Sequence, residues 1–158
     1  MSNQEPQGGS QPRFIGVFGG GTCSADIYEL SVQVGNAIAQ RGGVIICGGL
    51  GGVMEAVCKG AWQAGGVTIG ILPTDSVTSA NPYVTYPIAT GIGIARNSII
   101  VRTASVCLAI DGQYGTLSEI AYALQLGKKV VTLRSWDDIP GVIPANSVDM
   151  AISLLFDT

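Results

Sequence analysis

The segment from Asp111 to Glu119, DGQYGTLSE, holds the turn and the side chains of this chain that are best suited to chemistry. It follows an apolar run (residues 106–110) and leads into a segment with helical periodicity. A glycine-containing turn between a strand and a helix exposes several backbone N–H groups. Together with the positive end of the helix dipole, these groups suit a phosphate or another anion. The predicted ligand contacts in this turn are Gly112, Gln113, Tyr114, Gly115 and Thr116.

Glu119 carries a negative charge beside this predicted anion site, in what is expected to be the first turn of the helix. Thr116 and Glu119 have the spacing of a capping box, in which each side chain accepts a hydrogen bond from the other residue's backbone N–H. That interpretation gives Glu119 a structural role. The alternative is a role in the chemistry of the site, and the spacing alone leaves both interpretations open.

Arg96 is the second charged candidate. It lies in GIGIARN (residues 91–97), which is predicted to begin a helix after the fourth strand, and no charged residue lies between Asp75 and Arg96. Because the helix dipole disfavours a cation near a helix start, we expect Arg96 to have a partner. A bound phosphate or Glu119 would serve, whereas an ordinary surface ion pair is the alternative. The adjacent Asn97 is predicted to contact the ligand too.

Two further glycine clusters, GGGTCS (residues 19–24) and GGLGG (residues 48–52), each follow a predicted strand. Tight turns and close helix packing would explain one such loop, but three at one end of a sheet favour a phosphate-bearing ligand. No acidic residue follows the second strand, so NAD is not an expected cofactor. The predicted ligand contacts in these clusters are Gly20, Gly21, Thr22, Gly48, Gly49, Gly51 and Gly52.

The elements that position these residues alternate between strands and helices. The predicted strands are residues 14–18, 44–47, 67–72, 85–88, 106–110 and 130–133. The predicted helices are residues 26–41, 53–64, 91–103, 116–126 and 148–156. Strands that are apolar throughout indicate a parallel sheet covered on both faces, so we expect one α/β, doubly wound, Rossmann-like domain. Residues 1–12 are predicted to be a disordered tail and residues 13–158 the ligand-binding domain.

Composition excludes several classes of function. The chain has no histidine, which removes Ser-His-Asp and Cys-His triads and argues against a zinc site. Its net charge of −3 and the lack of a basic cluster argue against nucleic acid or a membrane surface as a partner. No apolar stretch is long enough to span a membrane, and the cysteines form no CxxC pair, so we expect a cytoplasmic protein with reduced thiols and no bound metal of its own. The four cysteines are Cys23, Cys47, Cys58 and Cys107.

The motif Gly112-x-x-Gly115-Thr116-x-x-Glu119 resembles the PGGxGTxxE signature of the "lonely guy" phosphoribohydrolases, long mislabelled as lysine decarboxylases. Arg96 precedes Glu119 by 23 residues, the separation of the arginine–glutamate pair that those enzymes use. GGLGGVM (residues 48–54) and GILP (residues 70–73) are similar to their YGGGxxGLM and GVIP segments. The resemblance covers about residues 14–133. It implies hydrolysis of the N-glycosidic bond of a nucleoside 5′-monophosphate.

Departures from that pattern point to a sister group. Residues 111–113 stand where the enzymes have a proline and two glycines, Ile94 and Asn97 replace a histidine and a lysine, and Ser118 replaces the first of two glutamates. NPY (residues 81–83) and TGIGIARN (residues 90–97) make the chain similar to small DprA-related bacterial proteins. They also make it similar to the algal molybdenum cofactor carrier proteins, whose counterparts read TGxGxARDN and GTxxE.

We therefore expect a carrier of a phosphate-bearing ligand, with molybdenum cofactor as the cargo that the resemblance implies. The glycine loops would hold the phosphate and the oxyanions of the metal centre, and Arg96 would add charge-assisted hydrogen bonds. The alternative is a phosphoribohydrolase in which Arg96 holds the substrate and Glu119 stabilises an oxocarbenium-like transition state. A homo-oligomer, dimer or tetramer, is expected in the carrier case. Lysine decarboxylation and pyridoxal phosphate are not expected.

Overall fold

The computed structural model describes residue 9 and residues 11–157, so most of the predicted tail (residues 1–12) lies outside the described residues. The chain forms a seven-stranded, wholly parallel sheet with the strand order β4-β3-β2-β1-β5-β6-β7. The strands are β1 (Phe14–Gly19), β2 (Val44–Cys47), β3 (Thr68–Leu72), β4 (Tyr86–Ala89), β5 (Val106–Ile110), β6 (Val130–Leu133) and β7 (Ile143–Ala145). The predicted α/β Rossmann-like fold is confirmed.

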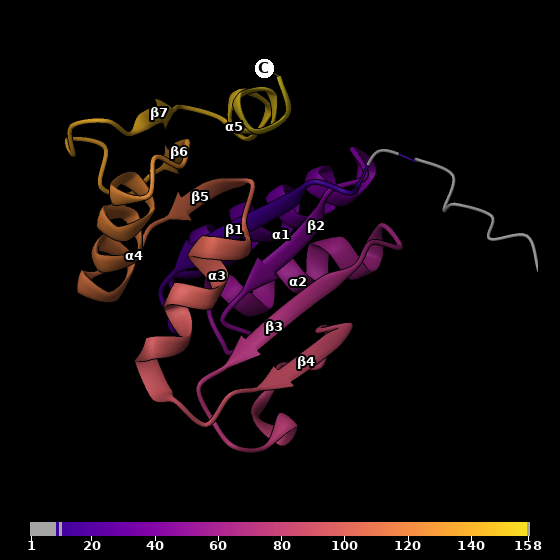
Figure 1. The fold of residues 1–158 in the computed structure, drawn as a ribbon. Coiled ribbons are helices and arrows are strands. Elements are labelled where there is room, and N and C mark those ends of the chain that lie inside the picture. Colours follow the sequence, from indigo (N-terminus) through magenta and orange to yellow (C-terminus); the bar gives the residue numbers. More distant parts are fainter. Residues whose placement is uncertain (1–8, 10, 158) are drawn as a thin grey trace, which may run out of the picture.

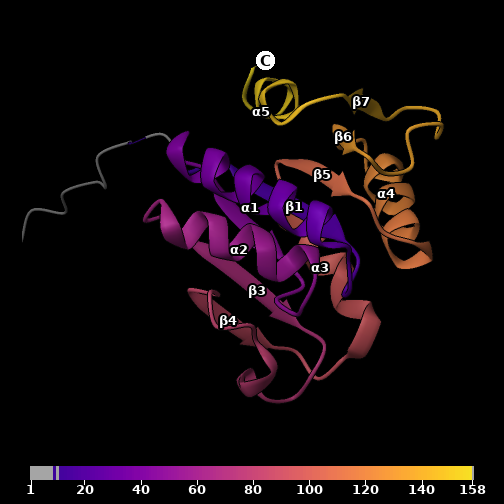
Figure 2. The same cartoon turned by 180° about the vertical axis from the view of Figure 1, so that it is seen from behind.

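Helices cover both faces of the sheet. The helices are α1 (Ala25–Gln40), α2 (Val53–Gln63), α3 (Asn97–Thr103), α4 (Tyr114–Gln125) and α5 (Val148–Phe156), with the 3-10 turns η1 (Val77–Ser79) and η2 (Gly93–Arg96). One face carries α1, α2 and α5, and the other carries α3 and α4 (Figures 1 and 2). Each face has its own cluster of buried apolar side chains, as expected for strands that are buried on both sides.

The main differences between prediction and structure concern one helix and one strand. The single helix expected over residues 91–103 is the short 3-10 turn η2 followed by α3. Gly91 and Gly93 both have positive φ, at 65° and 60°, which interrupts a regular helix before Arg96. Strand β7 was not predicted, because it has only three residues with a proline in the middle and pairs at the edge of the sheet.

Helices α1 and α2 pack at backbone distance. A Cβ atom at Gly35 would lie 2.0 Å from the carbonyl oxygen of Val57, and a Cβ atom at Gly60 would lie 1.9 Å from that of Val32. Any side chain at these two glycines would force the helices apart. Because α1 follows the first glycine loop and α2 follows the second, this packing fixes the two loops beside each other.

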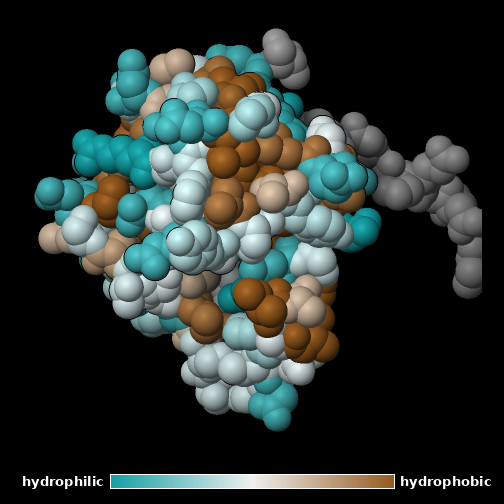
Figure 3. All heavy atoms as spheres, turned by 90° about the vertical axis from the view of Figure 1, so that its left-hand side faces the viewer, coloured by the Kyte–Doolittle hydropathy of each residue, from teal (hydrophilic) through white to brown (hydrophobic). Residues whose placement is uncertain are grey.

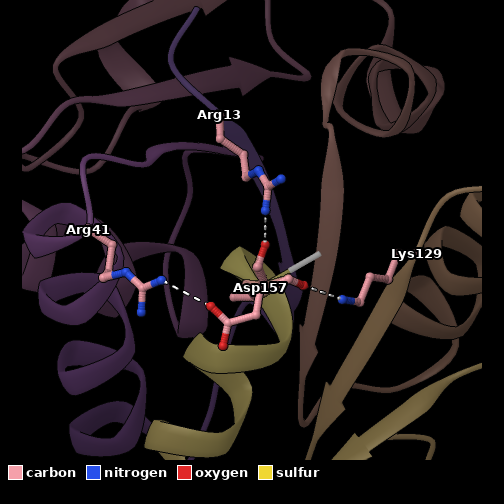
Figure 4. A network of polar contacts seen from close by, with 5 residues as sticks. Arg13, Arg41, Lys129 and Asp157 are labelled. Atoms are coloured by element: carbon pink, nitrogen blue, oxygen red, sulfur yellow. Dashed lines mark hydrogen bonds and ion pairs between the residues drawn. The ribbon is translucent and has the colours of Figure 1, made fainter. Parts of the chain in front are cut away.

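The end of α5 and Asp157 are anchored at the end of the sheet where the strands begin (Figure 4). Arg41 Nη2 lies 3.3 Å from Asp157 Oδ1, Lys129 Nζ donates to the Asp157 carbonyl oxygen at 3.4 Å, and Arg13 Nη1 donates to the Leu155 carbonyl oxygen at 2.6 Å. Since the ion pair is largely exposed, it contributes little by itself. Buried Ala151, Ile152 and Leu155 hold α5 on the sheet, and these polar contacts add to that packing. No described helix is long and apolar enough to cross a membrane.

We predict that Gly60→Ala lowers the free energy of unfolding by about 1–3 kcal/mol, because the added methyl group must displace the backbone of α1. Urea denaturation of the purified variant measures this. Gly115→Ala is the matched control: Gly115 is also helical, but open space surrounds the position of its Cβ atom. A Gly60→Ala variant as stable as the control would contradict the close packing of α1 and α2.

Candidate functional site

The sheet has its topological switch point between β1 and β5. From β1 the chain moves outward to β2, β3 and β4, and it then returns to place β5 on the other side of β1. Loops that leave β1 and β5 therefore diverge, and ligands of such sheets bind in the resulting crevice. A cavity of about 480 Å³ lies there, lined by both loops and by η2. We call it the glycine-loop cavity.

The structure brings together ten of the predicted site residues. Those that line the glycine-loop cavity are Gly20, Gly21, Thr22, Arg96, Asn97, Gly112, Gln113, Gly115, Thr116 and Glu119. Five others are not among its lining residues: Gly48, Gly49, Gly51, Gly52 and Tyr114. Gly19, Leu50, Met54, Ile94 and Asp111 complete the lining and were not predicted.

The second glycine loop supports the cavity from behind. Gly48 and Gly49 are buried, and a Cβ atom at Gly48 would lie 2.6 Å from Arg96 Nη2. Gly52 has a φ of 63°, and a Cβ atom there would lie 2.2 Å from the carbonyl oxygen of Gly20. That same carbonyl accepts a hydrogen bond from Val53 N at 3.0 Å. These glycines admit Arg96 and join the second loop to the first.

Arg96 is held rigidly at the edge of the cavity. Its side chain is only 9% exposed, Nε donates to the carbonyl oxygen of Ile71 at 2.8 Å, and Nη1 donates to Asn97 Oδ1. Burial lowers the pKa of the guanidinium, while the nearby Glu119 and Cys47 act to raise it. Arginine stays charged under all ordinary conditions, so the site has one fixed, oriented cation.

Glu119 does not take part in a capping box, so that interpretation, one of the two that the sequence left open, is wrong. Helix α4 begins at Tyr114, two residues before Thr116, with Gln113 as its N-cap and no side-chain cap. Glu119 therefore lies in the second turn rather than the first. The Thr116 side chain instead packs under Gly112, where a Cβ atom would lie 2.1 Å from Thr116 Oγ1. Gly112 has a φ of 87°, which favours glycine as well.

The carboxyl group of Glu119 is unusual in its protonation. Burial raises its pKa from 4.5 to about 8, and the positive charge of Arg96 only partly opposes this shift. Among the described residues the ion pair found joins Arg41 and Asp157, so Arg96 and Glu119 interact through space across the cavity rather than in direct contact. At neutral pH the Glu119 carboxyl is therefore mostly protonated and can donate a hydrogen bond.

The turn after β5 is held by residues that sequence reasoning did not include. Asp111 has a φ of 51°, and its carbonyl oxygen accepts a hydrogen bond from Ser135 Oγ at 2.7 Å. Trp136 Nε1 donates to the Gln113 carbonyl oxygen at 3.2 Å, and its ring lies 6.2 Å from that of Tyr114. The sequence of residues 136–138 by itself indicates only an ordinary surface turn. The signal that could have indicated a role is the position of a tryptophan just beyond the end of β6, at the edge of the sheet that carries the site.

Comparisons with known proteins identify the family of this chain and solved structures with the same fold. The model of the SLOG cluster4 family matches residues 12–153. The molybdenum cofactor binding protein of Rippkaea orientalis is 34% identical, with a TM-score of 0.88 over 93% of this chain and 97% of that protein. The molybdenum cofactor carrier protein of Chlamydomonas reinhardtii is 35% identical, with a TM-score of 0.82 over 89% and 94%. The resemblance to carrier proteins is confirmed.

Two more distant similarities complete the comparison. A cytokinin riboside 5′-monophosphate phosphoribohydrolase of Mycobacterium tuberculosis is 31% identical over 128 residues, or 75% of this chain and 68% of the relative. DNA processing protein A of Streptococcus pneumoniae is 17% identical with a TM-score of 0.76, which is a likeness of fold alone. The mycobacterial enzyme is therefore a relative at some distance, whereas DNA processing protein A shares the fold.

The titration of Glu119 gives a prediction about stability. The folded chain binds the proton of this carboxyl more tightly than the unfolded chain does. The stabilisation that comes from this tighter proton binding is therefore fully present below pH 4.5 and is lost as the pH rises through about 8. Glu119→Gln keeps a neutral side chain at every pH. We therefore expect wild type and variant to differ little near pH 4.5 and the variant to be the more stable at pH 9.

Urea denaturation at pH 4.5, 7 and 9 measures the difference. Glu29→Gln, which removes an exposed carboxyl of α1 outside the cavity, is the control and should show no such trend. If Glu119→Gln were less stable than wild type at all three pH values, Glu119 would have a structural role instead.

Proposed function

The chain belongs to the SLOG cluster4 family, and from this we propose that it binds and carries a phosphate-bearing small molecule, with molybdenum cofactor as the preferred cargo. The observation that carries the proposal is the likeness to molybdenum cofactor carriers over nearly the whole chain, at about a third of identical residues. Molybdenum cofactor is here the cargo and not a resident cofactor. The chemistry of the site supports the same proposal independently.

Backbone N–H groups provide most of the anion binding in this proposal. Gly20, Gly21 and Thr22 follow β1, and Gly115 and Thr116 lie in the first turn of α4, whose dipole favours negative charge. The ligand phosphate occupies the space between the two loops. Its oxygen atoms replace the water that would otherwise satisfy these donors.

Arg96 and Asn97 add the side-chain donors. The guanidinium of Arg96 donates through Nε to Ile71 and through Nη1 to Asn97. Nη2, which lies beside Gly48, has no hydrogen-bond acceptor among the described residues, and in this proposal it donates to the anion. The Oδ1 atom of Asn97 accepts from Arg96, so its Nδ2 group is the free donor of that amide. A charge-assisted hydrogen bond from Arg96 is stronger than a neutral one and gives the site its main electrostatic attraction.

The oligomeric state, the location and the partners of the carrier are further parts of the proposal. We propose a homo-oligomer, a cytoplasmic location, and no role for nucleic acid as a partner, because the net charge is −3 and basic residues are few. Ile92 and Ile99 are exposed and are candidates for an interface between subunits.

A phosphoribohydrolase is the second candidate function, and the similarity to the mycobacterial enzyme favours it. The same loops would then hold the 5′-phosphate of a nucleotide, and Glu119 would have to act on the sugar in its ionised form. An ionised Glu119 requires a pH above its raised pKa of about 8 or a second cation in the complex. The hydrolase stands second because the mycobacterial enzyme matches 75% of this chain, whereas the two carrier proteins match 93% and 89%.

We predict that Arg96→Ala weakens binding of molybdenum cofactor at least about tenfold, the loss expected for one charge-assisted hydrogen bond. Equilibrium titration with cofactor released from a molybdoenzyme measures the affinity. Arg102→Ala is the matched control, because Arg102 is exposed on α3 beside the ring of Tyr122 and lies outside the cavity. Unchanged affinity in Arg96→Ala would remove this residue from the site, and a wild-type protein that does not bind the cofactor would contradict the carrier function.

Base release from AMP and other nucleoside monophosphates tests the second candidate. We expect no turnover with wild-type protein at neutral pH, since the carboxyl of Glu119 is then mostly protonated. Glu119→Gln provides the blank for the assay. Turnover in wild type that disappears in this variant would establish a phosphoribohydrolase and displace the carrier.

A further inference from the structure

A second cavity adjoins the glycine-loop cavity and differs from it in character. It lies between η2 and α3 on one side and α4 on the other, and its volume is about 490 Å³. Its walls include Ala95, Val101 and Tyr122, so it is mainly apolar. The space-filling view of this side of the molecule shows brown, apolar surface bordered by pale, weakly polar surface (Figure 3). We call this cavity the groove.

Three residues belong to both cavities. Ile94, Asn97 and Glu119 line the glycine-loop cavity and also the groove. One molecule can therefore extend from the phosphate-binding loops into the groove across these three side chains. Ile94 is 72% exposed, which is a large exposure for an isoleucine beside a binding cavity. An apolar ligand surface laid over Ile94 would remove that exposure.

The junction supplies two polar groups with defined hydrogen-bonding roles. Asn97 presents a donor, because its carbonyl oxygen is already used by Arg96. The carboxyl of Glu119 has no ion-pair partner in the described part of the chain and can accept or donate there. A ring that carries a carbonyl oxygen next to N–H groups complements this pair of side chains.

We propose that the groove binds the fused, planar heterocycle of the ligand, with a 2-amino-4-oxopyrimidine edge directed at Asn97 and Glu119, while the phosphate of the same ligand lies in the glycine-loop cavity. This inference rests on the proposed function and adds the ring-binding part of the site. Small-molecule sites are commonly cavities of about 300–1,000 Å³ with apolar walls and a few convergent polar groups, and the groove has that composition. Pterins and guanine nucleotides share this edge.

The test separates ring binding from phosphate binding. GMP carries the required ring edge, ribose 5-phosphate carries the same phosphoester without a base, and inorganic phosphate carries neither base nor sugar. We expect wild type to bind GMP about tenfold more tightly than ribose 5-phosphate, which is the size of effect that one stacked base provides. Isothermal titration of all three probes measures the ratio.

Ala95→Trp fills the groove from an exposed position on η2. We expect it to reduce the preference for GMP over ribose 5-phosphate to about threefold or less, through loss of GMP affinity alone. Ala121→Trp is the matched control, since Ala121 is exposed on α4 and lines neither cavity. The control should keep the wild-type preference.

Each outcome tests either the binding of the ring in the groove or the proposed carrier function. If Ala95→Trp keeps the full preference for GMP, the ring does not lie in the groove and the inference is wrong. If the same variant still binds ribose 5-phosphate as wild type does, the phosphate site of the proposed function is unaffected by that result. Wild-type protein that binds none of the three probes would contradict the proposed function and the inference together. Light scattering on the same samples adds a third outcome. A change of molar mass in Ala95→Trp with the GMP preference retained would mean that a second copy of the chain covers the groove, and this would overturn the inference.

Discussion

Backbone contacts that only glycine permits set the geometry on which the site depends. Gly35 and Gly60 bring α1 and α2 to within backbone distance, and Gly52 brings the second loop onto the carbonyl oxygen of Gly20. Because each helix starts where its loop ends, the helix packing and the loop contact are one constraint and not two. A methyl group at any of these three positions would separate the loops and open the crevice at the switch point of the sheet. The high glycine content of the chain, 23 of 158 residues, follows in part from this demand.

The charges of the site rest on the same packing. Gly48 leaves room for the guanidinium of Arg96, and the carbonyl oxygen of Ile71 accepts a hydrogen bond from its Nε. Glu119 approaches from α4 on the other side and stops short of an ion pair. A direct ion pair would offset the positive charge of Arg96 within the cavity. Kept apart, the cation retains attraction for an incoming anion, and the carboxyl remains protonated because burial outweighs the influence of Arg96.

Sequence patterns predicted the sheet well because its strands are short apolar runs between glycine turns, and that pattern is typical of buried parallel strands. They missed β7, whose proline and half-exposed residues give no periodic signal. The sequence identified the glycines near the site. Their spacing does not show which of them contact a ligand and which contact other parts of the protein. Gly48 and Gly52 proved to face protein atoms. The contact of Trp136 with Gln113 joins residues 23 positions apart, and a long-range contact of this kind leaves no local pattern in the sequence.

The protonation of Glu119 is consistent with the choice of carrier over hydrolase that the comparisons with known proteins favour. A bound phosphate adds negative charge near this carboxyl, and like charge raises the pKa of an acid further. The ligand that the loops attract therefore stabilises the neutral form of Glu119. A neutral carboxyl cannot stabilise an oxocarbenium ion by charge, but it can exchange hydrogen bonds with a heterocycle at no electrostatic penalty toward the phosphate. A neutral Glu119 is therefore compatible with a site that holds an anionic ligand without reacting with it, as a carrier must.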